Sequence, residues 1–241
     1  MKRHIPLQGT FNIRDLGGYA AGESETLWRR CLRGDSLHRL DKNKADVLIK
    51  EGVTTVVDLR APGEVQMRPN PFSTNTSVCY QHMPLFLDAV GADQSRPFSL
   101  EEIYIRALTE QREQFAKVML LIAEAQNGGV LFHCTTGKDR TGLIAALLLS
   151  NAGVDDQAIC DDYALTGPLI APLQKEFLSH AAYFELSELA KHPMLECNPK
   201  TIMGVLNYIS GTYGSTSRYL IEAGLPWEAN EVLRKRLLGP T

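Results

Sequence analysis

The chain has 241 residues, a length that fits one large domain with a sizeable core or two small ones. Hydrophobic residues make up 44% of it and charged residues 22%, which is ordinary for a soluble globular protein. The formal net charge of -3 argues against a general nucleic-acid-binding protein, because binding to duplexes usually goes with a basic excess.

Neither a secretory signal nor a membrane anchor is visible. Pro6 and Gly9 interrupt the residues that follow the basic start, so no apolar signal segment forms. The longest apolar run, Leu143 to Leu149, is far too short to cross a bilayer. The five cysteines show no paired spacing, which suits reduced thiols better than a disulfide framework. We therefore expect a cytoplasmic protein without an integral membrane segment, with non-classical export left open.

The first half of the chain alternates predicted strands and helices. Apolar and β-branched runs predict strands at 27–32, 53–59, 78–83 and 130–132. Asp41 is a typical N-cap for a helix through about Lys50, and Ser99 with Glu102 forms the pattern of a capping box for a helix to about Gln126. The segment 84–97 has a proline at each end and is predicted to form a mobile flap.

The second half is predicted to be nearly all helix. The expected helices cover about 140–151, 155–166, 168–190, 199–213, 215–223 and 227–238. Strands that alternate with helices favour an α/β fold with a mostly parallel central sheet flanked by helices, followed by a helical C-terminal half. No internal repeat or linker is visible, so we expect one domain over residues 1–241, with its ligand beyond the carboxyl ends of the strands.

The segment from His133 to Gly142 has the pattern of a phosphate-binding loop. It follows a predicted strand and precedes an apolar helix, so its amides can converge near a helix N-terminus, where anions bind readily. The partial positive charge of the helix N-terminus, with Lys138 and Arg140 nearby, favours the thiolate form of Cys134. Arg140 adds a planar fork that can bind two oxygens of one phosphate.

These ten residues resemble the Cys-x5-Arg phosphate loop of the protein tyrosine phosphatase superfamily. The run Gly-Lys-Asp-Arg-Thr-Gly is similar to its atypical bacterial and fungal branch, which contains tyrosine and phosphoinositide phosphatases. Further motifs that resemble this branch lie at 12–19, at 33–37, at 58–60 with Glu64, and at 212–215 with 219–220. The resemblance covers nearly the whole chain. It implies a cysteine-phosphatase-like fold and a metal-independent phosphatase for phosphotyrosine, with phosphoserine, phosphothreonine and phosphoinositides as further substrates.

Each residue of the loop then has an expected role. Cys134 would attack phosphorus and form a phosphocysteine that water hydrolyses. Arg140 and the loop amides would stabilise the equatorial oxygens of the transition state. The Thr141 hydroxyl can donate to the sulfur. The expected substrate-binding residues are Thr135, Thr136, Gly137, Lys138 and Thr141.

The general acid has two candidates, because the Trp-Pro-Asp sequence usual in tyrosine phosphatases is absent. Asp139 lies inside the loop, where the negative charge of a bound phosphate would favour its protonated form. Asp88 lies on the predicted flap, where an upstream acid is expected. Asp139 could instead only pair with Lys138, Arg140 or Arg60, so both candidates remain open.

A second group of residues is expected to support the loop. The resemblance implies that His133 holds the loop and polarises Cys134, although a core histidine is an alternative. We interpret five polar residues at predicted turns and strand ends as support for the loop, or alternatively as ordinary turn and cap residues: Asp15, Arg60, Asn12, Arg14 and Asp58. In lipid phosphatases of the superfamily, a lysine placed like Lys138 suits an extra inositol phosphate; the alternative is a solvated lysine.

Other functions remain possible from the sequence. One alternative is a phosphatase for lipids or small metabolites, and another is a pseudophosphatase that binds a phosphorylated partner without turnover. Cys79 and His82 do not predict a metal site, because an alternating strand sends them to opposite faces. We expect neither a metal nor a cofactor, and a phosphorylated protein or a phosphoinositide as the partner.

Overall fold

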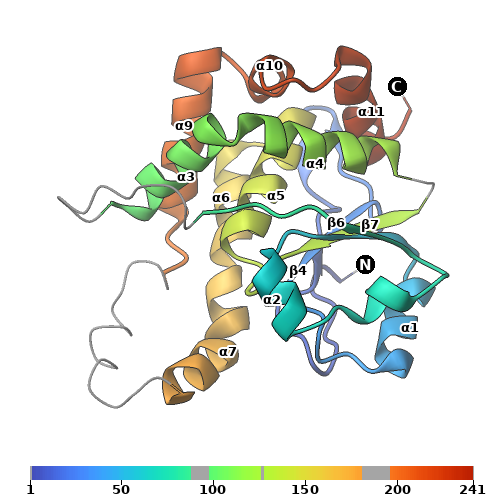
Figure 1. Cartoon of the computed structure of the whole chain (residues 1–241). Coiled ribbons are helices and arrows are strands. Elements are labelled where there is room, and N and C mark those ends of the chain that lie inside the picture. Colours follow the sequence, from blue (N-terminus) through green and yellow to red (C-terminus); the bar gives the residue numbers. More distant parts are fainter. Residues whose placement is uncertain (1, 88–97, 126–127, 181–195, 241) are drawn as a thin grey trace.

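The computed structural model describes residues 2–87, 98–125, 128–180 and 196–240. They contain a five-stranded sheet in the order β1-β4-β7-β5-β6 (Figure 1). The strands are β1 (Arg14–Asp15), β4 (Cys31–Gly34), β5 (Val53–Asp58), β6 (Cys79–His82) and β7 (Gly129–His133). Strands β4, β7, β5 and β6 are parallel and β1 is antiparallel to β4, so the predicted mostly parallel sheet is confirmed. A separate pair joins β2 (Ala20–Ala21) to β3 (Ser24–Glu25).

The central strand, β7, determines where the loop that begins at Cys134 leaves the sheet. All five of its residues are buried, as expected for a continuous apolar strand covered on both faces. His133 lies opposite Gly34 on β4 and opposite Asp58 on β5. The three strands therefore end at the same level, and the chain after His133 emerges at the carboxyl edge of the sheet.

Helices cover both faces of the sheet. They are α1 (Lys42–Lys50), α2 (Pro62–Met67), α3 (Leu100–Glu110), α4 (Arg112–Glu124), α5 (Asp139–Ala152), α6 (Asp156–Ala164), α7 (Thr166–His180), α9 (Pro199–Tyr213), α10 (Thr216–Glu222) and α11 (Trp227–Leu238), with a 3₁₀ turn at η1 (Pro71–Thr74). The larger apolar core includes α3, α4, α5 and the C-terminal helices, and the smaller one includes α1 and η1. In Figure 1 these two groups lie on opposite sides of the strands.

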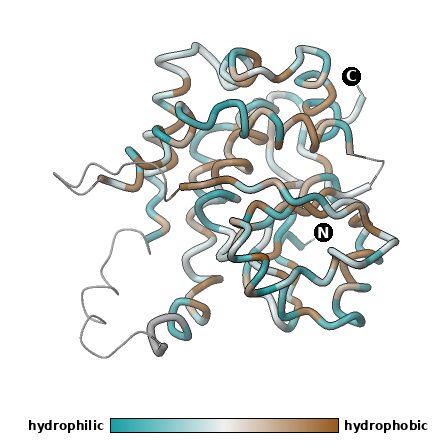
Figure 2. The backbone as a smooth tube through the Cα atoms, in the orientation of Figure 1, coloured by the Kyte–Doolittle hydropathy of each residue, from teal (hydrophilic) through white to brown (hydrophobic). Residues whose placement is uncertain are grey.

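Helix α5 is the centre of the larger core. Eleven of its fourteen residues are buried, because the Leu- and Ala-rich sequence leaves it hydrophobic all round. Figure 2 shows hydrophobic residues along the helices and strands at the centre of the molecule. None of the helices in the described ranges is both long and apolar enough to cross a bilayer.

The strand predicted at 27–32 is shorter than expected and begins only at Cys31. Arg29 adopts a left-handed conformation with φ of 64°, which ends any extended chain at that point. The Asp15 carboxylate stabilises this turn, because it accepts hydrogen bonds from the Arg29 backbone N–H at 2.9 Å and from Arg29 Nη1 at 3.0 Å. The prediction is therefore wrong for residues 27–30.

The single helix predicted from Ser99 to about Gln126 is two helices that meet at Gln111. The capping box of Ser99 and Glu102 is present, but α3 ends at Glu110 and α4 begins at Arg112. The Gln111 side chain pairs with the backbone of Phe86: Nε2 donates to the carbonyl, and Oε1 accepts from the N–H at 3.1 Å. Gln114 Nε2 donates to the Pro84 carbonyl at 3.3 Å, so the start of α4 is attached to the chain that follows β6.

The other predicted elements agree with the structure to within a few residues. This holds for the helix at 41–50, where the Asp41 carboxylate accepts from the Lys44 N–H, and for the strands at 53–59 and 78–83. Helix α7 begins at Thr166 and is described to His180; residues 181–190 of the predicted helix lie outside the described part of the chain. Asp88 and most of the predicted flap also lie outside it.

Candidate active site

The candidate active site is the loop of residues 134–138 between β7 and α5. Cys134 directly follows β7 and is 1% exposed. Helix α5 starts at Asp139, so the unpaired N–H groups and the partial positive charge of its first turn lie next to the cysteine. The strand, Cys134 and the helix N-terminus are thus in the arrangement that the sequence predicts.

Gly137 allows the loop to turn. Its φ is 71°, in the left-handed region that side chains rarely adopt. A Cβ atom there would lie 2.6 Å from the Gly34 carbonyl oxygen and 2.7 Å from Asn12 Nδ2. Both the backbone conformation and the packing therefore require glycine.

The carbonyl groups of the loop are held on its outer side. Asn12 Nδ2 donates to the carbonyls of Thr136 at 3.0 Å and Gly137 at 3.3 Å. Arg33 Nη2 donates to the Gly137 carbonyl at 2.8 Å. Because the C=O and N–H of one trans peptide point in opposite directions, the next N–H groups are turned toward the inside of the loop. One side chain from just before β1 and one from β4, the neighbour of β7, thus turn the loop amides inward, the orientation that an oxyanion needs.

Arg140 is held by Glu64 of α2 through two hydrogen bonds. Nη1 donates to Oε2 at 2.6 Å and Nη2 donates to Oε1 at 3.0 Å, and the Thr135 hydroxyl donates to the same carboxylate. Burial opposes the charge, but these donors lower the pKa of Glu64 to about 2. No described residue accepts a hydrogen bond from Arg140 Nε, which leaves this donor for a phosphate oxygen.

Glu64 was missed as a functional residue by the sequence analysis, which quoted it only within a motif. Its place four residues after Arg60 is the one signal that could have found it, since the motif is short and close to the carboxyl end of β5. Its partner Arg140 is 76 positions away, and no local pattern predicts that pair.

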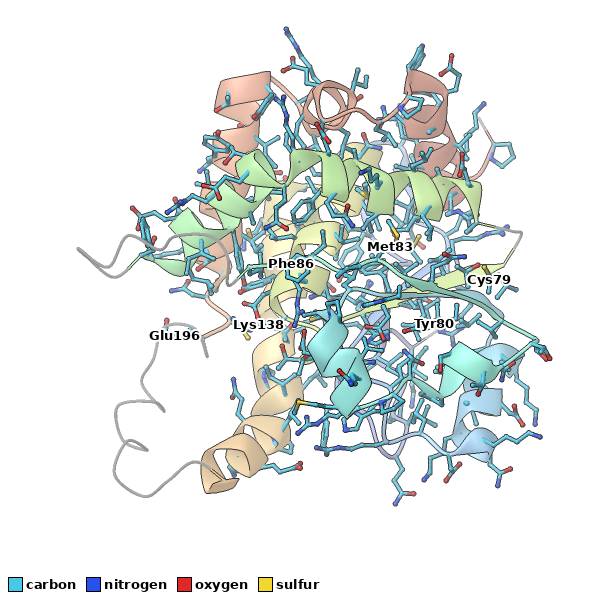
Figure 3. The ribbon with its side chains drawn as sticks, in the orientation of Figure 1. Cys79, Tyr80, Met83, Phe86, Lys138 and Glu196 are labelled. Carbon is cyan, nitrogen blue, oxygen red and sulfur yellow. The ribbon has the colours of Figure 1, made fainter. Side chains whose placement is uncertain are left out.

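Lys138 and Asp139 form an ion pair beside the loop. Lys138 is only 2% exposed; its Nζ lies 2.6 Å from Asp139 Oδ1 and donates to the Glu196 carbonyl at 3.3 Å (Figure 3). Lys138 is therefore not a solvated side chain in this structure. Asp139 also accepts from the hydroxyl of Tyr104 on α3 at 2.5 Å. Its side chain remains 21% exposed.

His133 contacts the backbone carbonyl of Cys134. The Phe72 N–H donates to Asn70 Oδ1, so the Asn70 amide nitrogen faces His133 Nε2 at 2.8 Å and donates to it. His133 Nδ1 then carries the proton and donates to the Cys134 carbonyl at 3.1 Å. Burial lowers the pKa of His133, which agrees with a neutral ring that fixes the start of the loop.

Arg60 and Asp15 lie at different distances from the loop. Arg60 is buried and donates to the Asp58 carboxylate and to the Ser36 hydroxyl, while the Ser36 N–H donates to the Thr135 carbonyl at 3.1 Å. Arg60 thus supports the loop through one intermediate residue. Asp15 accepts from the N–H of Gly17 and from Arg29, and it has no recorded contact with the loop in the described structure.

Thr141 lies at the beginning of α5 and is fully buried. Its hydroxyl makes no hydrogen bond with any described residue. A buried hydroxyl without a partner is unusual in folded proteins. Within the described residues this hydroxyl is therefore a donor that remains available.

A buried network behind the loop contains a residue that the sequence analysis did not name. Asp162 of α6 accepts hydrogen bonds from Arg14 Nε at 3.1 Å, from Arg33 Nη1 and from the Tyr19 hydroxyl at 2.9 Å. Burial opposes the charge of Asp162, but the two guanidinium groups lower its pKa. Arg33, which binds the Gly137 carbonyl, is thus fixed from its other side.

Nothing in the described residues forms a site for a metal ion. No group of three or more His, Cys, Asp or Glu side chains is close enough to hold one in the described ranges. Along β6, Cys79 and Gln81 are exposed and Tyr80 and His82 are half-buried, which fits the predicted alternation.

The sequence of the chain matches a known protein family and is similar to named relatives. A sequence model described as "Tyrosine phosphatase family" matches residues 5–239. A tyrosine-protein phosphatase of Nostoc commune is 32% identical over 215 residues, which cover 86% of this chain and 73% of the relative. The triple specificity protein phosphatase PtpB of Mycobacterium tuberculosis is 27% identical over 277 residues, which cover 97% of this chain and 98% of PtpB.

Two solved structures are also similar to the chain. The crystal structure of P. aeruginosa TpbA has a TM-score of 0.39 and 19% identity, over 61% of this chain and 78% of TpbA. The Siw14 catalytic core has a TM-score of 0.39 and 13% identity, over 81% of this chain and 97% of the core.

Proposed function

Because the chain belongs to the tyrosine phosphatase family and is a cysteine-dependent phosphomonoesterase, we propose that Cys134 is its nucleophile and Arg140 its phosphate clamp. This proposal is carried by the structure of the loop. A buried cysteine lies between a strand end and a helix N-terminus, and the loop carbonyls of Thr136 and Gly137 are held outward. Arg140, with its free Nε donor, completes a cradle for the three phosphate oxygens.

In the first step the Cys134 thiolate attacks phosphorus. The S–P bond forms, the P–O bond to the leaving group breaks, and Asp139 gives its proton to the leaving oxygen. In the second step water attacks phosphorus, and the Asp139 carboxylate takes a proton from that water. The S–P bond breaks, so inorganic phosphate and the thiolate are released.

We assign the general acid to Asp139 rather than to Asp88. Asp139 is partly exposed beside the loop and is held by Tyr104 and Lys138, which gives a carboxyl group a defined position near the leaving oxygen. The Thr141 hydroxyl, which has no partner among the described residues, would donate to the sulfur as it leaves in the second step.

The substrate class that we propose is phosphotyrosine, with phosphoserine, phosphothreonine and phosphoinositides as further substrates. The names of two relatives support phosphotyrosine and more than one class of substrate, since one is a tyrosine-protein phosphatase and another a triple specificity protein phosphatase. A comparison of phosphotyrosine peptide, phosphoserine peptide and the phosphoinositide series, on one preparation with EDTA present, tests it. Activity confined to the lipids would move the substrate class to phosphoinositides.

The mechanism is tested with Cys134→Ser and Arg140→Lys. Cys134→Ser should abolish turnover while binding of a phosphate ester survives, because most of the cradle is backbone and Arg140. Arg140→Lys should be nearly as severe, because a point charge cannot replace a planar fork. A Ser variant that keeps more than about a hundredth of the wild-type kcat, roughly 2.7 kcal/mol of barrier, would exclude the covalent mechanism.

We further propose that residues 1–241 form one domain that works in a reducing compartment such as the cytoplasm. The family match over 5–239 supports the first point, and the five unpaired thiols support the second. Limited proteolysis should release no stable half of the chain. Activity should fall in oxidising buffer and return with a thiol reductant.

A further inference from the structure

The two carboxylate oxygens of Asp139 have different surroundings. Oδ1 accepts a hydrogen bond from the Tyr104 hydroxyl at 2.5 Å and lies 2.6 Å from Lys138 Nζ. Within the described ranges, no donor is recorded for Oδ2. Because Oδ1 already has two donors, a proton on Asp139 is more favourable on Oδ2.

Tyr104 is fixed by its packing. It lies on α3, is fully buried, and its ring meets that of Tyr163 edge-on with centroids 6.4 Å apart. Its hydroxyl lies 2.9 Å from the Tyr163 hydroxyl. Since Tyr104 gives its one proton to Asp139, Tyr163 must be the donor in the bond between the two tyrosines. The chain of donors therefore runs from Tyr163 to Tyr104 to Asp139.

Tyr104 stays a donor over the working pH range. Burial, and then the charge of Asp139, raise the pKa of Tyr104 well above its ordinary value. A phenol with a raised pKa keeps its proton for Asp139 at neutral pH. The distance and the burial of this pair, rather than its titration, make it a fixed support.

We propose that Tyr104 is a positioning residue for the general acid: it anchors Asp139 Oδ1, so that Oδ2 carries the proton and faces the leaving oxygen. The inference rests on the proposed role of Asp139. It adds a residue on α3, 35 positions before Asp139, which contacts the proposed acid. Orientation of a catalytic carboxyl by a buried donor is the kind of support that precise sites require.

The removal of this donor should have two effects with predictable signs. A carboxylate that loses a hydrogen-bond donor is less stable, so the protonated form persists to higher pH. The alkaline limb of the kcat profile therefore moves upward in pH. At the same time the proton is no longer aimed at the leaving oxygen, so substrates with poor leaving groups slow down.

The test compares Tyr104→Phe with Tyr163→Phe as a matched control. Both variants remove one hydroxyl from the same buried pair, but only Tyr104 touches Asp139. We expect Tyr104→Phe to lower kcat for phosphotyrosine about tenfold or more and kcat for p-nitrophenyl phosphate less than about threefold. Its alkaline limb should move to higher pH. Tyr163→Phe should leave the ratio of the two kcat values within about twofold of wild type.

Equal losses on both substrates in Tyr104→Phe, with an unmoved alkaline limb, would assign Tyr104 a purely structural role and overturn the inference. Asp139→Asn separates this outcome from a failure of the proposed function. If Asp139→Asn does not change leaving-group sensitivity, Asp139 is not the acid. If it does and Tyr104→Phe does not, only the inference about Tyr104 fails.

A second measurement keeps the inference testable if Tyr104→Phe does not fold. Incorporation of 3-fluorotyrosine at Tyr104 keeps the ring and makes the hydroxyl a stronger donor. A stronger donor stabilises the carboxylate, so the alkaline limb should move to lower pH, opposite to the effect of Tyr104→Phe. A limb that stays in place would overturn the inference.

Discussion

Replacement of Glu64 by glutamine should uncouple Arg140 from its support while the loop residues stay unchanged. The Glu64 carboxylate accepts hydrogen bonds from both terminal nitrogens of Arg140 and from the Thr135 hydroxyl. It also accepts a hydrogen bond from the Ala61 N–H at 2.7 Å. Glutamine keeps one acceptor oxygen, but its NH₂ group faces the remaining donors and its charge is lost. Arg140 would then be free to turn away from the position in which it binds phosphate.

The expected magnitude follows from the geometry of this pair. It is bidentate and partly buried, with Arg140 17% and Glu64 33% exposed, so it exceeds an ordinary surface ion pair. We expect kcat/KM to fall about 10- to 100-fold, which corresponds to about 1.4–2.7 kcal/mol of transition-state stabilisation. Folding stability should fall by only about 1 kcal/mol, because water screens a pair at this exposure.

Steady-state kinetics with p-nitrophenyl phosphate, together with urea unfolding, measure both effects. Glu222→Gln is the control, because it breaks an exposed ion pair with Arg218 that is far from the loop in the fold. If kcat/KM of Glu64→Gln stays within about twofold of the control, Arg140 needs no anchor and our account of the clamp is wrong.

Four further results are expected. The difference in free energy of unfolding between wild type and Glu64→Gln should be largest above about pH 4.5 and should vanish as the pH falls toward 2, because the pKa of Glu64 is lowered in the folded state. Urea unfolding at several pH values measures this difference. Gly137→Ala should lower kcat by more than about 100-fold, since its Cβ would meet a carbonyl oxygen at 2.6 Å, while circular dichroism stays native. Asn12→Ala should weaken inhibition by inorganic phosphate about fivefold, the value of one hydrogen bond. Unchanged inhibition would mean that the loop carbonyls do not need the hydrogen bonds from Asn12. Iodoacetamide in a Cys79→Ser background should label Cys134 first, because burial raises the pKa of the other three thiols; mass spectrometry identifies the site.

The phosphate-binding loop could be predicted because its information is local. The predicted strand, the segment 133–142 and the predicted helix follow one another directly in the sequence. The spacing of Cys134 and Arg140 alone places both residues on one turn. The same holds for α1 and the C-terminal helices, whose caps and apolar periodicity lie within each segment.

The partners of the loop could not be predicted, because they come from distant segments. Glu64, Tyr104 and Asp162 contact the loop residues or their supports only after the chain has folded, and an isolated acidic or aromatic residue carries no sign of its partner. The break at Gln111 was missed for the same reason. Helix propensity continues through that position, and a tertiary contact with Phe86 prevails over it.

The side-chain amides of Gln111 and Gln114 also affect how copies of this protein meet in concentrated solution. An edge strand with free backbone groups is a template onto which a strand of another molecule can add, which is a route to aggregation. Strand β6 is an edge of the described sheet, but beyond its end Gln111 covers the N–H and carbonyl of Phe86, and Gln114 covers the Pro84 carbonyl. Pro84 itself has no N–H to offer. On this side of the described sheet, β6 itself offers an open edge of four residues, a stretch too short to recruit a stable intermolecular strand.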